Sequence, residues 1–157
     1  MRRTPRRGRD RPPGTVTRLG AAAAILVGLG LGGCSGPGSA AREDAVTAVR
    51  AKAEALRTDL QAAARGSTGD AQLEAVREAL PDLPLTATTG GDGVVVQGAV
   101  TAGAEAGGGL SYEGFSARLC LRYRIAGGTG ETEIEDAACP ADVDTVAPAD
   151  ETVQLGD

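Results

Sequence analysis

The side chains that most often carry out chemistry are sparse in this sequence. It has no histidine, which removes the usual general base, the Ser-His-Asp arrangement and the commonest ligand of transition metals. Paired carboxylates could still cleave glycosidic bonds, but the acidic residues lie in expected turns and near the C-terminus, and their spacing selects no pair. We therefore expect no catalytic residues, no metal site, no cofactor and no enzymatic activity.

The first of three cysteines, Cys34, follows a segment laid out like an export signal. Arginines are concentrated before the apolar run Leu19–Gly33, which is about 15 residues long. A helix needs ~20 apolar residues to span the hydrocarbon core of a membrane. We interpret residues 1–33 as a signal peptide with a cytoplasmic basic flank and an exported remainder.

The run ends in Leu31-Gly32-Gly33-Cys34, which resembles the lipobox of bacterial lipoproteins. The resemblance covers this segment alone. It implies a thioether between the Cys34 thiol and diacylglycerol, cleavage between Gly33 and Cys34, and a new amino terminus open to acylation, typically by palmitate. Two or more acyl chains anchor a protein stably. We expect residues 34–39 to be a lipidated cysteine with a flexible tether, on the outer face of the cell membrane; the alternative is an ordinary cysteine.

Two further patterns in this segment carry less weight. Gly28–Gly33 matches the dinucleotide-binding pattern G-x-G-x-x-G, but no strand precedes it and export would discard it. The pairs Arg2-Arg3 and Arg6-Arg7 lack the apolar residues that usually complete a twin-arginine signal. Export by the Sec or the Tat route stays open.

The net charge of −5 combines a basic segment up to Gly33 with a strongly acidic remainder. An acidic surface repels nucleic-acid phosphates and anionic lipid headgroups. We therefore exclude nucleic acid as a partner.

Apolar periodicity predicts two helices in the first half of the exported chain. Between residues 40 and 64, apolar side chains recur at steps of three and four, and these are Val46, Val49, Ala53, Leu56, Leu60 and Ala63. A shorter helix with Leu73, Val76 and Leu80 ends at Pro81. The longer stripe favours packing on the protein's own sheet over coiled-coil dimerisation, because it lasts under four heptads.

Glycine turns and alternating residues predict strands after Leu83. Residues 85–89 and 94–102 flank a hairpin turn at 90–93, and residues 104–109 are expected to form a loose loop. The clearest strand is 115–125, where apolar residues at odd positions alternate with Ser116, Arg118, Cys120, Arg122 and Arg124. This period of two predicts one face in the core and one in solvent.

The return strand carries Glu131, Glu133 and Glu135 at alternate positions. In either of two neighbouring registers these glutamates face the arginines, which makes an arginine patch for an anionic ligand the less favoured interpretation.

The remaining cysteines lie on that same face, and an oxidising compartment favours their pairing. We therefore predict a disulfide between Cys120 and Cys139, with two unpaired thiols as the alternative. The two are directly opposite in the register with connection Gly127–Thr132 and diagonal in the other. The opposed register suits the required Cβ separation of ~3.5–4.5 Å better.

These elements predict an α+β fold, with one long and one short N-terminal helix packed on a small antiparallel sheet. The single domain is expected over residues 40–139. The acidic tail 140–157 is expected to be disordered, or at most to add one edge strand.

The expected function is that of a membrane-anchored, extracytoplasmic lipoprotein, a non-enzymatic accessory or protein-binding module whose partner is an envelope protein. The alternative is a carrier of a lipid or a small apolar ligand held between helix and sheet.

Overall fold

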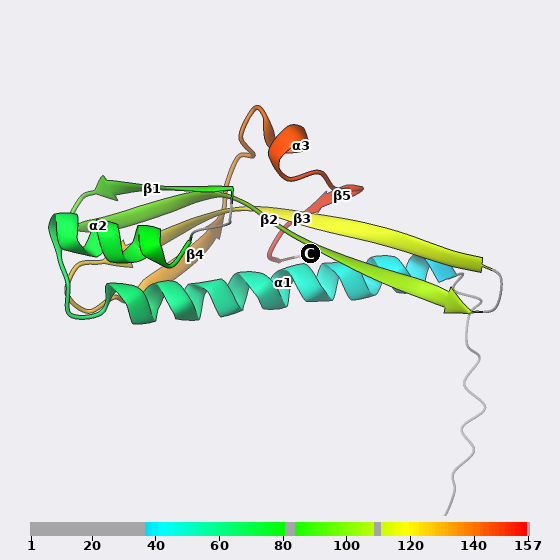
Figure 1. Ribbon diagram of the computed structural model, residues 1–157, viewed down its shortest axis with the longest axis horizontal. Coiled ribbons are helices and arrows are strands. Elements are labelled where there is room, and N and C mark those ends of the chain that lie inside the picture. Colours follow the sequence, from blue (N-terminus) through cyan, green and yellow to red (C-terminus); the bar gives the residue numbers. More distant parts are fainter. Residues whose placement is uncertain (1–36, 81–83, 109–110, 157) are drawn as a thin grey trace, which may run out of the picture. The chain divides into compact units, whose positions relative to one another are not determined.

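The computed structural model describes residues 37–80, 84–108 and 111–156, and their fold is α+β, with helices packed on a five-stranded sheet (Figure 1). The predicted signal peptide, Cys34 and residues 35–36 of the predicted tether lie outside the described residues. The expectation of a flexible tether is wrong for residues 37–39, because α1 begins at Pro37. The elements are α1 (Pro37–Ala64), α2 (Gly69–Glu78), β1 (Leu85–Gly90), β2 (Gly93–Gly108), β3 (Ser111–Ala126), β4 (Thr132–Asp136), α3 (Val143–Val146) and β5 (Glu151–Val153).

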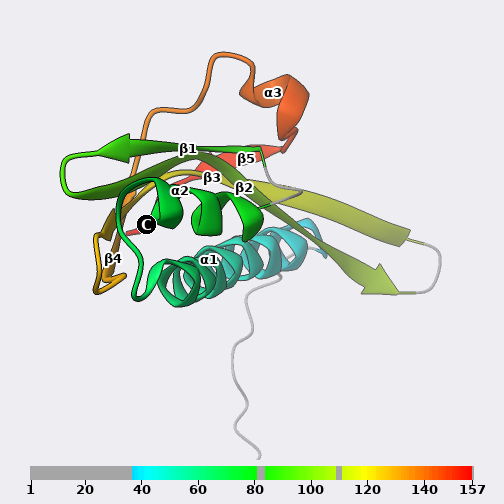
Figure 2. The same cartoon turned by 60° about the vertical axis from the view of Figure 1, so that its left-hand side comes forward.

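Helix α1 packs on one face of the sheet along β2 and β3 (Figures 1 and 2). Its buried stripe consists of Ala41, Ala45, Val49, Ala53, Leu56, Leu60 and Ala64. Small alanines let the helix approach the strands closely, and the larger Tyr123 of β3 reaches across, where its hydroxyl donates to the Ala53 carbonyl at 3.1 Å. The prediction that this stripe packs on the protein's own sheet is confirmed. Val46 and Ala63 lie at the margins of the stripe and are half-buried.

Helix α2 lies on the same side of the sheet as α1, beside β1 (Figure 2). The turn between the two helices is bound to the turn between β3 and β4, because the Gly66 N–H donates to the Gly128 carbonyl and the Gly128 N–H to the Ser67 carbonyl, both at 2.9 Å. The buried amide of Gln72 donates to the Ala126 carbonyl at 2.9 Å. These contacts fix one end of the sheet.

The strand order is β1-β2-β3-β4, with antiparallel neighbours. A two-residue turn joins β1 to β2, and Gly91 at φ +61° adopts the left-handed conformation that such turns require. Strand β2 continues to Gly108, so the expectation of a loose loop at 104–109 is wrong for residues 104–108, and Gly109 lies outside the described residues. Alternate alanines of this half, Ala102 and Ala104, are half-buried on the core, and backbone pairing with β3 compensates for their weak strand preference.

Beyond Gly98, β2 pairs only with β3 within the described part of the chain, so its other edge has no partner strand there. The free side is partly covered, since Lys52 of α1 donates to the Thr101 carbonyl at 3.0 Å. A lysine at an exposed sheet edge is one of the ways in which proteins discourage edge-to-edge aggregation.

The alternation predicted for β3 is confirmed for its core face, but the expectation that the other face lies in solvent is wrong for Arg118 and Cys120, which are buried. Ala117, Leu119, Leu121, Tyr123 and Ile125 are at most 2 % exposed, while Arg122 and Arg124 lie on the opposite face. Strand β4 pairs Arg122 with Glu135 and Arg124 with Glu133.

This register places Ala137, not Cys139, next to Cys120, and the Ala137 N–H donates to the Cys120 carbonyl at 2.9 Å. The preference for the opposed register is therefore wrong. The chain leaves β4 after Asp136 and folds back across the sheet, which brings the Cα of Cys139 within 5.1 Å of the Cα of Cys120 and their sulfurs to bonding distance. The geometry is that of the predicted pair.

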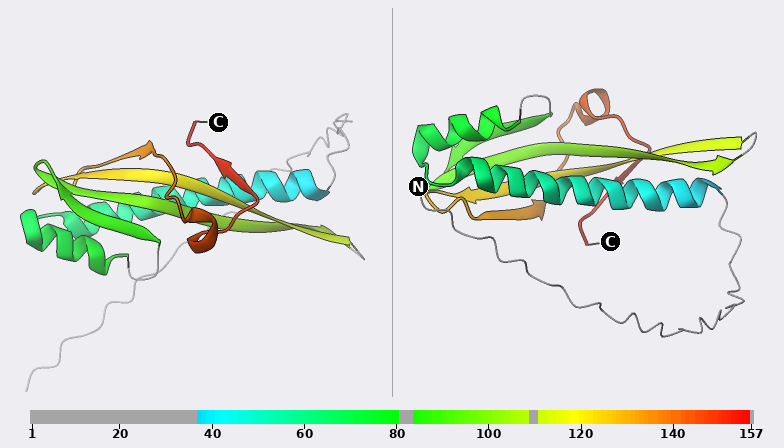
Figure 3. Two further views of the ribbon diagram at one scale, coloured as in Figure 1. Left: turned by 90° about the horizontal axis from the view of Figure 1, so that it is seen from above. Right: turned by 60° about the horizontal axis from the view of Figure 1, so that its bottom comes forward.

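The segment after Pro140 is folded, so the expectation of a disordered tail is wrong for residues 140–156. Helix α3 lies on the face of the sheet opposite α1 (Figure 3), where Val143 and Ala147 pack against Ala99 and Cys120. Strand β5 then pairs with β3 in parallel, an edge strand of the kind that the sequence allowed. The physical reason is that Arg118 of β3, which is only 8 % exposed, donates hydrogen bonds to this segment.

Carboxylates of β5 and the residue before it complete the attachment. The hydroxyl and the N–H of Ser116 donate to Asp150, and these bonds lower the pKa of Asp150. Arg42 of α1 binds Glu151 with two hydrogen bonds, which lower the pKa of Glu151 and raise that of Arg42. The domain therefore extends to residue 156, and no helix among the described residues is long and apolar enough to cross a membrane.

Candidate functional site

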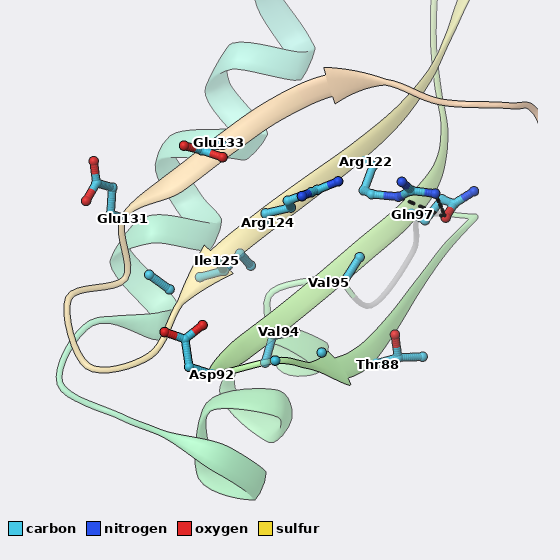
Figure 4. Close-up of a pocket in the computed structure, with 13 residues that line it drawn as sticks. Thr88, Asp92, Val94, Val95, Gln97, Arg122, Arg124, Ile125, Glu131 and Glu133 are labelled. Carbon is cyan, nitrogen blue, oxygen red and sulfur yellow. Dashed lines mark hydrogen bonds between the residues drawn. The ribbon is translucent and has the colours of Figure 1, made fainter.

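The face of the sheet opposite α1 is covered in its middle and open at one end. The disulfide loop and α3 cover Ala99 and Cys120. Toward the β1–β2 and β3–β4 turns, an open groove of about 730 Å³ lies over β1, β2, β3 and β4 (Figure 4). We call this the outer-face groove, and its lining residues are Thr88, Gly90, Gly91, Asp92, Val94, Val95, Gln97, Arg122, Arg124, Ile125, Ala126, Glu131 and Glu133.

The pleat of the strands determines which side chains line the groove. Val95 and Gln97 of β2 are the neighbours of Arg124 and Arg122 of β3 in the sheet register. Because alternate residues point to opposite faces, the intervening Val94 and Val96 are buried toward α1. Thr88 of β1 pairs with Val95 and extends the surface to the next strand.

Glu135 of β4 holds both arginines of the groove. The same Glu135 oxygen accepts from Arg124 at 2.9 Å and from Arg122 at 3.3 Å. The amide oxygen of Gln97 also accepts from Arg122, at 3.2 and 3.4 Å. The side chains of Arg122, Arg124 and Glu135 are 37–56 % exposed, so each ion pair contributes only ~0–1 kcal/mol. Their effect is to hold the two guanidinium groups along the sheet.

Charges of both signs line the groove. Asp92 lies in the β1–β2 turn, Glu131 lies at the β3–β4 turn, and Glu133 is the neighbour of Arg124 in the sheet (Figure 4). Small-molecule pockets are mostly apolar with a few convergent polar groups, whereas this surface is broad and mixed. It suits a protein surface better than a single small anion.

Two smaller hollows flank the sheet elsewhere. One of about 580 Å³ lies between α1 and β4 and is lined by Arg57, Gln61 and residues 131–135. The other, of about 530 Å³, lies along β2 and β3 near Glu105, Phe115 and Asp150. The buried Thr132 lines the first of these hollows, but its hydroxyl donates to the Gly130 carbonyl at 2.9 Å. Among the described residues no group of three or more Cys, Asp or Glu side chains could hold a metal ion.

The three arginines that the sequence placed on one face of β3 have different surroundings in the structure. Arg122 and Arg124 reach the groove, but Arg118 is covered by the C-terminal segment and makes hydrogen bonds to Thr152, Asp144 and the Ala147 carbonyl. Of the predicted site residues, Cys120 and Cys139 are brought together, while Gly33 and Cys34 lie outside the described residues.

The sequence reasoning missed Thr88, Val95 and Gln97. Three consecutive valines, Val94–Val96, conceal the alternation of β2, and Gln97 alone could have indicated its solvent face.

Comparisons with known proteins add no assignment, since no protein-family model, no curated protein and no solved structure matches the chain.

Proposed function

We propose that this chain is an outward-facing lipoprotein, anchored to the cell membrane through Cys34, that binds a partner protein of the cell envelope in the outer-face groove. The lipobox-like segment at residues 31–34 supports the anchor. The proposal is of a non-enzymatic accessory module, since the sequence has no histidine to act as a general base.

The observation that carries the binding function is the uncovered end of an otherwise covered sheet face. The C-terminal segment shields the middle of that face, yet the groove leaves Val95, Gln97 and Arg124 accessible from solvent. Arginine is enriched at protein interfaces, where its planar group pairs with carboxylates. A partner carboxylate that competes with Glu135 would find two guanidinium groups already positioned.

The carrier hypothesis gains no specific support. Residues between α1 and the sheet, including Leu60, Val96 and Leu119, are completely buried. Of the three hollows described above, the one between α1 and the sheet, beside β4, is lined mostly by polar and charged side chains, which do not suit an apolar ligand. The carrier hypothesis stays an untested alternative.

Site-specific photo-crosslinking in the native bacterial host tests the binding surface. A photoreactive residue at Thr88 should give a specific adduct with an envelope protein, whereas the same residue at Ala55, exposed on α1, should not. Arg124→Glu should reduce the Thr88 adduct because it reverses charge in the groove. Arg65→Glu makes the same change in net charge outside the groove and should leave the adduct unchanged. No adduct from Thr88, or equal adducts from both positions, would contradict a partner in the groove.

The anchor is tested separately with Cys34→Ala. Labelling with a clickable fatty acid should disappear in this variant and persist in Cys120→Ala. Undiminished label in Cys34→Ala would show that the lipid is attached elsewhere.

A further inference from the structure

The start of α1 and the far end of the β2–β3 hairpin lie side by side (Figures 1 and 3). A Cβ atom built on Gly38 would lie 2.5 Å from a carboxylate oxygen of Glu113. The outer-face groove is at the other end of the sheet, by the β1–β2 turn. The domain therefore has one end marked by its first residues and an opposite end marked by the groove.

The chain length before α1 restricts where a lipid anchor can be. Pro37, the first residue of α1, is three residues after Cys34, and three extended residues span at most ~11 Å. If Cys34 carries the acyl chains, the first turn of α1 must lie close to the headgroups. The end of the hairpin beside that turn must lie there as well.

Tyr112 gives this end a side chain suited to a membrane surface. It is 69 % exposed, and the other exposed large hydrophobic side chain in the described part of the chain, Val146, belongs to α3. Tyrosine concentrates at the boundary of membrane and water, because its ring is apolar and its hydroxyl is polar. A membrane surface at this end of the domain would cover the Tyr112 ring.

We propose that the end of the domain formed by the first turn of α1 and Tyr112 of β3 rests on the outer leaflet, with the Tyr112 ring at headgroup level. This proposal depends on the lipid anchor of the proposed function and adds an orientation to it. Exposed Glu105 and Glu113 near the same end oppose anionic lipid. The contact is therefore shallow, and zwitterionic headgroups are the lipid chemistry that it fits.

The orientation sets the height of the groove. Helix α1 has 28 residues, which corresponds to ~42 Å at 1.5 Å per residue. With its first turn at the membrane and its axis away from the bilayer, the helix would hold the outer-face groove tens of ångströms above the lipid.

The absence of tryptophan from the chain permits a direct test with single-tryptophan variants. Tyr112→Trp reports on the proposed contact, and Thr89→Trp reports on the opposite end, where Thr89 is exposed near the end of β1. Each full-length lipidated protein is purified from bacterial membranes and reconstituted in phosphatidylcholine vesicles, with and without bromine-labelled acyl chains. Flotation of the vesicles measures anchoring independently.

We expect both proteins to float with the vesicles, and Tyr112→Trp alone to shift its emission to shorter wavelength and lose most of it to the brominated lipid. Adding Cys34→Ala to Tyr112→Trp should abolish flotation and quenching together. Flotation without quenching of Tyr112→Trp would overturn the orientation and leave the anchor intact. Equal quenching of both tryptophans would overturn it too, because the domain would then lie flat. Failure of the lipidated protein to float would overturn the anchor and with it the orientation.

Discussion

Arg118 is the residue that attaches the C-terminal segment to the sheet. Its guanidinium donates to the Thr152 hydroxyl, to Asp144 and to the Ala147 carbonyl at 2.8–3.0 Å. Asp144 is 88 % exposed, so most of the compensation for burying this charge comes from the neutral acceptors. Because these acceptors lie on both sides of residues 148–150, one side chain organises the whole segment.

Replacing this group should therefore be costly. Arg118→Met keeps much of the side-chain volume and removes every one of these bonds, and we expect a loss of about 2–3 kcal/mol in the free energy of unfolding. Arg124→Met, which alters an exposed pair, should cost ~0–1 kcal/mol. Urea unfolding followed by circular dichroism measures both. Equal losses in the two variants would mean that Arg118 contributes no more than a surface arginine.

The two tyrosines form a matched pair of a buried and an exposed hydroxyl. Tyr123 is completely buried and donates to the Ala53 carbonyl, and burial raises its pKa far above the ordinary value. Tyr123→Phe should lower the free energy of unfolding by ~0.5–1.5 kcal/mol at neutral pH, whereas Tyr112→Phe should have no effect.

The raised pKa of Tyr123 also gives a pH dependence with a definite sign. The folded state keeps this hydroxyl protonated, and the unfolded chain ionises it near pH 10, so its contribution is complete below pH ~10 and declines as the pH rises above that value. Urea midpoints between neutral pH and pH 11 should fall more for the natural protein than for Tyr123→Phe. Parallel pH profiles would contradict this assignment.

At the scale of elements, the sequence predicted the segments in which one buried face produces a periodic apolar pattern. Strand β3 alternates strictly, because α1 covers one of its faces along most of its length. The second half of β2 escaped prediction, since Ala and Gly carry no periodic signal and its pairing comes from β3. The segment 140–156 escaped too, because its order depends on Arg118 and Ser116, which are distant in sequence.

The C-terminal segment should loosen in acid. The pKa values of Asp150 and Glu151 are lowered by their partners, Ser116 and Arg42. Both carboxylates therefore stabilise the attachment above pH ~4–4.5, the range of their unfolded values, and lose that effect as the pH falls through the lower folded values.

Resonances of residues 150–154 in NMR spectra should report local opening below pH ~4, before the signals of β2 and β3 change. Asp150→Asn retains the shape of the side chain and should weaken this pH dependence. An unchanged acid profile in that variant would assign the effect to other carboxylates.

At the scale of the whole molecule, the core contains few large side chains, and covalent closure contributes correspondingly more. Cys120 and Cys139 are 19 residues apart in sequence, and closing a loop of that size stabilises by ~3 kcal/mol in the chain-entropy model. The double variant Cys120→Ala/Cys139→Ala should lose about this amount in urea unfolding.

Mass spectrometry after alkylation without reductant provides the chemical check. The natural protein should gain no alkyl group on these cysteines, and two after reduction. Two groups before reduction would show that the sulfurs, although adjacent, are not joined.

The bond between Arg42 and Glu151 joins residues 109 positions apart. During synthesis, α1 emerges long before β2 and β3, which cover its apolar stripe, and β5 emerges last. Contacts of such long range make folding slow. Until β2 and β3 have been synthesised, the apolar stripe of α1 has no partner strand to cover it. We therefore expect the contacts of α1 with the sheet to form only after β2 and β3 have been synthesised. Transport of an unfolded chain would be compatible with that order of events, and loss of the final strand would leave both α1 and β3 incompletely paired.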